Sequence, residues 1–504
     1  MVASRIAMFV IILWLIGKVL AFGKDLLVSY YFGASIQTDA YFIASNIPSL
    51  VYAGLLATVP LVLLPLYSKK IAEGNEGHAY RFASSVLNWY VAAALVFTVV
   101  VFTQAELLVA CIAPTVTPKT AALAVILTKI FSATFVFSMA SAVFTTIQLS
   151  NKQALGVQLI PIFNNGLFVL GVFLFSSQYG IYAAAVSATV AWVVQIPLQA
   201  LFIKGKYKYS STWALEKQDR RALFIVFLPA LIGVSIEQLN PIVSIYFGSS
   251  LAEGSVSMLS YAFRLISFCT GVFIVITSTI SFPSFADKVS GKKLVELIEH
   301  IYQNTRLTLF TSIFVALVLS FFSRDVVSVI LERGQLSADH ADIVAKLLSV
   351  LALSIPFVAL REVYIRGIYA FSEAKLGMLT GVIALMANII ICYCFIHVYG
   401  IQAISVATVV AAFASCVVSF LLLHKIFGKW PSVHLFSFVL RLTIVVVVTL
   451  TILYGFFSFF LVHSALIRLV IGAVIAGLSY MTTSIIVGII RINFSNRTLE
   501  SELF

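Results

Sequence analysis

The stretch VSYYFGAS at residues 28–35 returns as VSIYFGSS at residues 243–250, and each copy closes a long apolar run. Farther along, YGI at residues 179–181 returns at residues 399–401 with nearly the same spacing. Two matches at nearly equal spacings indicate an internal repeat. Each half holds six apolar segments, and two more follow the second half.

The composition is that of a membrane protein. Apolar residues make up 61% of the 504 residues and charged residues 10%, against about 45–50% and about 25% in soluble domains. This excludes an ordinary soluble enzyme, a disordered chain and a coiled coil. The apolar runs are long and unbroken, unlike the alternating strands of a membrane barrel. Most of the fourteen runs can cross a bilayer as a helix, and they cover 7–32, 40–66, 82–102, 121–149, 155–176, 181–203, 222–247, 255–285, 307–323, 341–370, 376–396, 401–424, 435–462 and 466–490.

The repeat predicts how these helices are organised. An even number of spans separates the copies, so both copies have the same orientation, as in transporters built from parallel repeats around a central cavity. We therefore predict an all-α polytopic membrane protein with about fourteen transmembrane helices. Its parts are an N-lobe (1–210), a C-lobe (211–430) and two further helices with a tail (431–504). Short interfacial helices are expected at 105–112 and 326–332, in matching places of the two halves.

The distribution of basic residues predicts the orientation. The net charge is +12, and about twenty Lys and Arg fall on one side of the predicted membrane against about four on the other. This places both termini in the cytoplasm and explains the charge without nucleic acid. There is no phosphate-binding loop for ATP. The five scattered cysteines predict no disulfide framework, and no metal site or resident cofactor is expected.

Ionisable residues inside the spans predict the functional site. An ion in the hydrocarbon layer costs roughly 2.5–3.5 kcal/mol on insertion scales, so such residues normally face a cavity or a partner. Lys18, Lys24 and Arg264 would form a cationic patch between the lobes, with Asp25 and Asp39 as counter-charges. Such a patch suits phosphate or pyrophosphate. The alternative for Lys24 and Asp25 is a self-neutralising pair near the membrane edge.

Other polar residues in the spans are weaker candidates. We expect a second group to line the cavity or its gates, together with Asp25 and Asp39: Asn46, Tyr52, Ser257, Arg361 and Arg366. An internal ion pair is the alternative for the two arginines, which flank Glu362. A coupling-ion site, for Na⁺ or H⁺, could use Glu237, Asn240 and Asn388, although a protonated or paired glutamate is the simpler interpretation.

At this point the residues resemble a known family, the MviN/MurJ flippases of the multidrug/oligosaccharidyl-lipid/polysaccharide exporter superfamily. The N-terminal signature is the more specific part of the resemblance, which covers most of the chain and is found in GKVLAFGKD (17–25), YFGA (31–34), TDAYF (38–42), GVS (233–235), GSVS (254–257) and YAFRL (261–265). The chain departs from the family pattern in four places: lysines replace the span-1 arginines, Tyr52 replaces a span-2 arginine, the acidic-glycine pair that follows it is absent around Ala57 and Thr58, and Phe263 replaces an aspartate.

The resemblance implies a function. Members move lipid II, an undecaprenyl-pyrophosphate-linked glycan precursor of peptidoglycan, from the inner to the outer leaflet. In that interpretation Lys18, Lys24 and Arg264 bind the pyrophosphate and Asp39 matches the family's loop aspartate. The alternatives are an O-antigen or exopolysaccharide flippase, a cation-coupled multidrug exporter, and a membrane glycan polymerase or ligase.

We expect no enzyme activity, and a location in the bacterial cytoplasmic membrane. The membrane potential or a coupling ion would drive the transport cycle. Membrane lipids and cell-wall synthesis proteins are the further partners expected.

Overall fold

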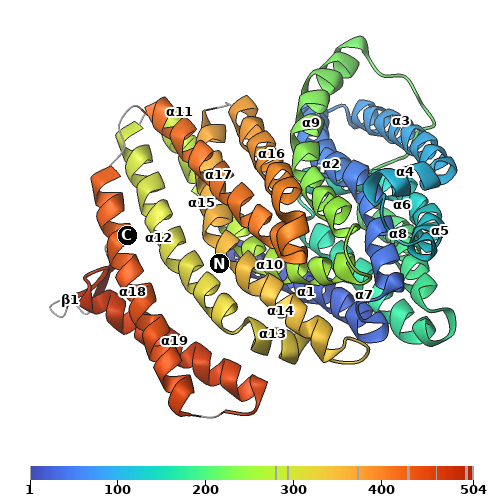
Figure 1. Cartoon of the computed structure of the whole chain (residues 1–504). Helices are drawn as coiled ribbons and strands as arrows, with labels where there is room; N and C mark the ends of the chain where they lie inside the picture. The colour runs from blue at the N-terminus through green and yellow to red at the C-terminus, as the bar shows by residue number, and fades with distance from the viewer. Residues whose placement is uncertain are drawn as a thin grey trace. The chain divides into compact units, whose positions relative to one another are not determined.

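The protein is a helical bundle with many long helices (Figure 1). The computed structural model describes residues 2–277, 281–291, 294–371, 374–427, 432–460, 462–493 and 498–501. Within these ranges the side chains of 2–8, 10–11, 50–58, 61, 154, 218, 222, 224–237, 282–283, 286, 290, 374, 432–433 and 491–501 are not described.

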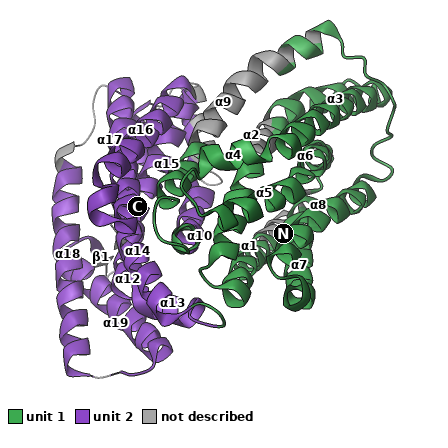
Figure 2. Ribbon diagram, turned by 45° about the vertical axis from the view of Figure 1, so that its right-hand side comes forward, with its two compact units in different colours: residues 1–260, 334–336 green, residues 261–333, 337–504 purple. Residues whose placement is uncertain are grey.

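By its internal contacts the chain divides into two compact units, coloured separately in Figure 2. Unit 1 comprises Met1–Ser260 and Gly334–Leu336. Its helices are α1 (Val2–Phe32), α2 (Ile36–Ala72), α3 (Glu76–Thr103), α4 (Ala105–Ile112), α5 (Pro118–Ser132), α6 (Thr134–Ser150), α7 (Ala154–Tyr179), α8 (Ile181–Ile203), α9 (Lys217–Gly248) and the start of α10 (Ser255–Ile276).

Unit 2 comprises Tyr261–Arg333 and Ser337–Phe504. After the rest of α10 it contains α11 (Phe282–Ser290), α12 (Leu294–Phe321), α13 (Ser323–Ile330), α14 (Ala338–Leu351), a 3-10 turn (Ala352–Ser354), α15 (Ile355–Ala370), α16 (Ala374–Tyr399), α17 (Ile401–Phe427), α18 (Ser432–Phe459), α19 (Ala465–Ile486), and strands β1 (Ile490–Asn493) and β2 (Thr498–Ser501). The lobe boundaries predicted from the repeat stay a prediction.

The internal repeat is confirmed in the order and length of the elements. Helices α3 and α12 have 28 residues each, α4 and α13 have 8 each, and α7 and α16 have 26 each. The YGI repeat marks the same turn twice: Gly180 and Gly400 separate two long helices with φ of 55° and 54°. Only glycine adopts this backbone conformation at little cost, so the matched residues have the same structural task.

The prediction of a polytopic helical membrane protein is also confirmed. Within the described residues eleven helical segments are long and apolar enough to cross a membrane. The other three predicted spans fall on α1, α2 and α9, which contain side chains outside the description. Fourteen spans are therefore compatible with the structure. Large apolar side chains cover the outside, as a bilayer requires; Phe173, Val398 and Tyr454 are 63%, 72% and 75% exposed.

Several predicted segments differ in detail. The expected helix 105–112 matches α4, and the expected 326–332 segment begins earlier as α13. The predicted spans 121–149 and 341–370 are each interrupted, at Ala133 and at Ala352–Ser354. Apolar periodicity does not detect such breaks because the residues on either side are equally apolar. The chain after α19 forms an antiparallel two-stranded hairpin, following Gly488 with φ of 79°.

An ionic cluster ties three elements of unit 2 together. Arg324 on α13 pairs with Glu332 in the following loop and with Asp342 on α14. Arg468 on α19 lies 3.5 Å from Asp325. The hydrogen bond from Arg324 holds the pKa of Glu332 below its usual value, whereas burial raises the pKa of the Asp325 carboxyl. These groups link α13 to α14 and to the C-terminal helices.

This cluster predicts a pH-dependent contribution to stability. Because the folded pKa of Glu332 is depressed, its stabilisation is complete above the ordinary value of 4.5 and is lost as pH falls through the folded value. Glu332→Gln should cost about 1 kcal/mol at pH 7, since the pair is partly solvated. The melting temperatures of the two proteins should converge below pH 4.5. A difference that persists unchanged in acid would rule out the charge as its source.

Candidate functional site

Two of the three predicted basic residues lie on α1. Lys18 is exposed, with its Nζ 5.6 Å from the centroid of the Trp14 ring. Lys24 is half-buried and lies 5.0 Å from the ring of Phe168 on α7, against which α1 packs. Asp25 beside it is buried at 9% exposure. A cation over an aromatic face is stabilised without losing its charge, so Lys24 can still attract an anion.

The third basic residue, Arg264, is exposed on α10 and belongs to unit 2, whereas the lysines belong to unit 1. Convergence of the three residues on one patch stays a prediction. Within α10 itself, Arg264 lies seven residues after Ser257, so both lie on the same face of the helix, two turns apart. What fixes Ser257 therefore also sets the rotation of the helix that presents Arg264.

Asp39 fixes the start of α10. Its carboxylate accepts the backbone N–H of Gly254 at Oδ2 and that of Ser257 at Oδ1, both at 2.7 Å. The Ser257 hydroxyl donates to the same Oδ1 and contacts Thr38 Oγ1 at 2.8 Å. Asp39 is 4% exposed. A carboxylate on the first turn of a helix satisfies unpaired N–H groups and interacts favourably with the helix dipole. We call these four residues the Asp39 clamp.

The clamp is built from two helix starts. Ser35 caps α2 in a capping box with Thr38, and this places Asp39 in the first turn. Nearby, the loop residue Gly334 lies so close to the carbonyl of Tyr30 that a Cβ there would clash with the oxygen. Gln335 donates its N–H to that carbonyl at 2.9 Å. Within unit 1 the start of α2 is thus joined to the start of α10, and the end of α1 is joined to residues 334–335.

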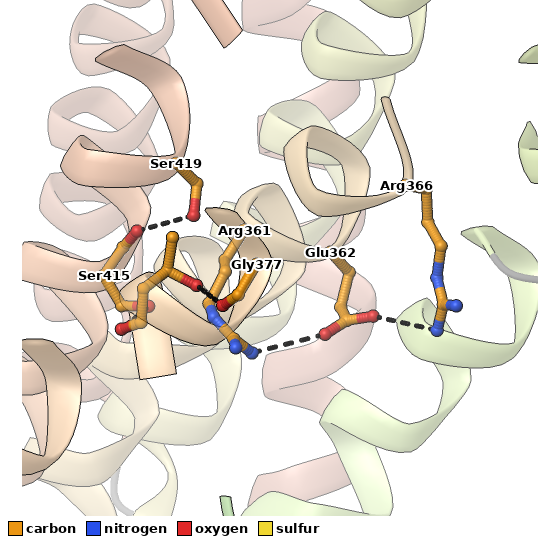
Figure 3. Close-up of polar contacts among 7 residues, drawn as sticks. Arg361, Glu362, Arg366, Gly377, Ser415 and Ser419 are labelled. Carbon is orange, nitrogen blue, oxygen red and sulfur yellow. Dashed lines mark hydrogen bonds and ion pairs between the residues drawn. The ribbon is translucent and has the colours of Figure 1, made fainter. Parts of the chain in front are cut away.

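The predicted gate arginines form a charged triad on α15. Figure 3 shows Glu362 between Arg361 and Arg366, with N···O distances of 3.5 and 3.4 Å. The Glu362 side chain is 12% exposed, and those of Arg361 and Arg366 are 15% and 26% exposed. Hydroxyls on the adjoining α16 and α17 are bonded to backbone carbonyls. The two arginines therefore form the internal ion pairs that were the alternative interpretation. A role of these arginines at a gate stays a prediction.

The remaining predicted residues lie on α2, α9 and α16. Asn46 donates to the carbonyl of Phe42 at 2.7 Å, within α2. The buried Asn388 accepts a hydrogen bond from the thiol of Cys392 at 3.4 Å. Asn240 is half-buried on α9. The side chains of Tyr52 and Glu237 lie outside the described residues, so the coupling-ion site stays a prediction.

One group of side chains in unit 1 has metal-like spacing. Ligand atoms of His78, Glu216 and Asp219 lie within 4.8 Å of one another. However, the Lys70 ammonium is 3.0 Å from Asp219, and His78 Nε2 is 2.9 Å from Glu216. A metal ion would have to displace the lysine, and we assign none here.

Comparison with solved structures identifies the fold. The chain resembles a lipid II flippase MurJ in an inward closed conformation, with a TM-score of 0.81 and 24% identity over 95% of this chain and 98% of that one. It also resembles a multidrug resistance MATE transporter of the MOP superfamily in an inward-facing conformation, with a TM-score of 0.73 and 14% identity over 82% and 94% of the two chains. The chain therefore has the polytopic helical fold of these two proteins.

Sequence comparison identifies the family. The family model for lipid II flippase MurJ matches residues 28–474. A probable lipid II flippase MurJ of Buchnera aphidicola is 25% identical over 500 residues, covering 95% of this chain and 96% of the relative. The lipid II flippase MurJ of Burkholderia cenocepacia is 25% identical over 435 residues, 82% of each chain. The chain belongs to the MurJ lipid II flippase family, which confirms the resemblance and favours the lipid II interpretation over the alternatives.

The clamp was only partly predictable. Asp39 and Ser257 are both among the sequence candidates, but their hydrogen bond joins residues 218 positions apart, and no local pattern pairs them. Thr38 and Gly254 are not among the candidates. The signal for Thr38 was its position three residues after Ser35, which is the spacing of a capping box.

The clamp predicts a local effect of Asp39→Asn. The amide retains one acceptor oxygen but loses the charge. The free energy needed to open the first turn of α10 should therefore fall by about 1.5–3 kcal/mol. Hydrogen exchange at the amides of Gly254 and Ser257 should accelerate accordingly. Ser257→Ala, which keeps both backbone donors, is the matched control and should accelerate exchange less. Unchanged exchange in Asp39→Asn would show that the carboxylate does not hold the turn.

The triad predicts a stability effect in unit 2. Glu362→Gln leaves two neighbouring arginines without the charge between them, and removing one partner of a buried pair typically costs about 3 kcal/mol or more. The melting temperature of the purified protein should fall clearly, whereas Ser419→Ala on α17 should change it little. Equal melting temperatures for Glu362→Gln and the parent would contradict a stabilising role for the triad.

Proposed function

We propose that this protein moves lipid II across the bacterial cytoplasmic membrane, from the inner to the outer leaflet, by alternating access. Membership of the MurJ lipid II flippase family is the observation that supports this most directly. The repeated element order also supports it, because parallel repeats suit two lobes that rock around a central site.

The pyrophosphate is the part of the substrate that we expect the protein to hold most firmly. Lys18, Lys24 and Arg264 would neutralise it, with the arginine binding two oxygens at once and each lysine acting as a point charge. The glycan head group would enter the cavity while the polyprenyl tail stays in lipid. Asp25 would lower the net positive charge of the patch. A patch with too much positive charge would bind the pyrophosphate so tightly that it could not be released.

The Asp39 clamp is suited to act as the gate that closes the outer side. Its bonds are few and are confined to the first turn of α10, so breaking them frees the start of α10 without unfolding the helix. Because Arg264 shares a helix face with Ser257, the same opening would move the arginine. Release of the clamp and release of the pyrophosphate would then be coupled through one rigid element.

The energy source and further roles complete the proposal. Moving net charge across the membrane is worth about 2.3 kcal/mol per charge per 100 mV, so the membrane potential can drive part of the cycle. A coupling ion at Glu237, Asn240 and Asn388 is the alternative source. The cycle breaks no covalent bond, and we propose no enzyme activity. Both termini would be cytoplasmic, since the basic loops lie on that side.

Genetic rescue tests the function. The gene is expressed in a bacterium whose own lipid II flippase can be switched off, and growth is measured after depletion. We expect growth to be restored with normal peptidoglycan synthesis. Failure despite normal expression in the membrane, together with rescue of an O-antigen flippase mutant, would contradict lipid II as the substrate.

The basic patch predicts a specific variant in this assay. Arg264→Ala should abolish rescue, since losing one charge-assisted contact costs about 1.5–3 kcal/mol, or about tenfold to a hundredfold in affinity. Lys24→Arg should retain rescue because the charge is kept. Lys346→Gln, an exposed residue on α14, is the control. Full rescue by Arg264→Ala at normal protein level would remove the residue from the site.

A further inference from the structure

The linker between α8 and α9 is held along α3 as an extended strap. It spans residues 204–216, and Figure 2 shows its trace beside α3. Its side-chain and backbone groups are hydrogen-bonded to α3 at 2.7–3.0 Å, through the pairs Ser84 with Tyr207, Asn88 with Tyr209 and Thr212, Trp89 with Trp213, and Ser85 with Ala214. We call residues 204–216 the linker strap.

The strap lies where the lipid-facing part of α3 begins. Residues 82–87 of α3 are buried, whereas Trp89 and the large apolar residues beyond it, such as Val96 and Val99, are exposed. The Trp89 and Trp213 rings meet edge to face at 5.5 Å, and each side chain is about half exposed. Tyr209 is 60% exposed. Half-exposed Trp and Tyr at such a boundary are typical of the interface between lipid tails and headgroups.

The acidic residues around the strap are engaged internally. Glu76 accepts a hydrogen bond from Tyr80 at 3.1 Å. Glu216 pairs with His78 at 2.9 Å, and Asp219 pairs with Lys70 at 3.0 Å. The buried Lys70–Asp219 pair is 11% and 10% exposed. Asp219 is thus neutralised by Lys70, whereas Glu76 and Glu216 are exposed and keep their charge, so two carboxylates face the basic residues of this surface.

The basic residues on the same surface are exposed. None of them forms an ion pair with a residue that the structure describes, and they are Arg81, Lys204, Lys206, Lys208, Lys217, Arg220 and Arg221. A cluster of exposed bases next to interfacial aromatic residues matches the layer of lipid phosphates that lies just outside the hydrocarbon.

We propose that the linker strap is a binding surface for the headgroups of anionic phospholipids. Trp89 and Trp213 anchor it at the level where acyl chains begin, and the lysines on either side of Tyr207 reach the phosphates. An acidic protein would also find the bases, but it would leave the half-exposed aromatic pair without an apolar partner. This proposal does not depend on the transport function. The predicted orientation enters only in assigning the bound phospholipids to the inner leaflet.

Fluorescence quenching at the aromatic pair tests this directly. Trp14, Trp192 and Trp430 are replaced by Phe in the full-length chain, which leaves Trp89 and Trp213 as reporters. The protein is reconstituted into mixtures of phosphatidylglycerol and phosphatidylcholine in which either lipid, in turn, has brominated acyl chains that quench tryptophan. The relative binding constant of the two lipids at the strap follows from the pair of titrations.

We expect the parent protein to prefer phosphatidylglycerol at this position by about fivefold for each of Lys206 and Lys208, or about 25-fold for the two together. Lys206→Gln with Lys208→Gln should bring the ratio close to one. The matched control is Lys119→Gln with Lys346→Gln, which removes two exposed charges elsewhere and should keep the preference. Unchanged elution and melting temperature establish that both double variants are folded.

Three results would overturn the proposal. Equal quenching by the two lipids in the parent would mean that lipid contacts the strap without selecting its headgroup. Absence of quenching by either lipid would mean that something other than lipid covers the pair, such as a soluble domain. An equal loss of preference in both double variants would assign the effect to net charge. None of these results bears on lipid II transport, so the proposed function is tested separately.

Discussion

The buried carboxylate of Asp39 is the interaction on which the described arrangement depends most. It accepts two amide hydrogen bonds of 2.7 Å at the start of α10, so that this helix end can be buried; Asp39 itself is 4% exposed. The helix that it fixes crosses from unit 1 into unit 2 and bears Arg264 on the face that the clamp contacts. One anionic side chain thereby orients the cationic one that the transport hypothesis needs most.

The membrane environment explains why a small number of polar contacts has a large effect on the arrangement of the helices. In hydrocarbon each unpaired polar group is costly, so the chain uses helices and satisfies most polar side chains locally. The exceptions are ionisable groups, and these are the candidates for function: the lysines of α1, the triad of α15 and the carboxylate at the start of α10. Each of them lies on an element with a counterpart in the other half of the repeat, which is why a single fold can use different chemistry in its two copies.

The sequence predicted the architecture better than the contacts. Long apolar runs and the matched turns at Gly180 and Gly400 were sufficient for the helical class and the repeat. The breaks at Ala133 and Ala352–Ser354 were missed because the hydrophobic pattern continues through them. The partner of Asp39 was missed because it lies more than two hundred positions away. The linker strap has no periodicity of its own, since its order comes from hydrogen bonds to α3.

The central claim is that a few basic side chains within the membrane select a doubly phosphorylated lipid carrier. The most direct measurement is the affinity of the purified protein for lipid II compared with the same glycan on a monophosphate carrier. The account predicts that the pyrophosphate form binds about tenfold tighter or more, as expected when a second charge-assisted contact is made, and that Arg264→Gln removes the difference. Equal affinity for the two carriers, or discrimination that survives the substitution, would contradict it.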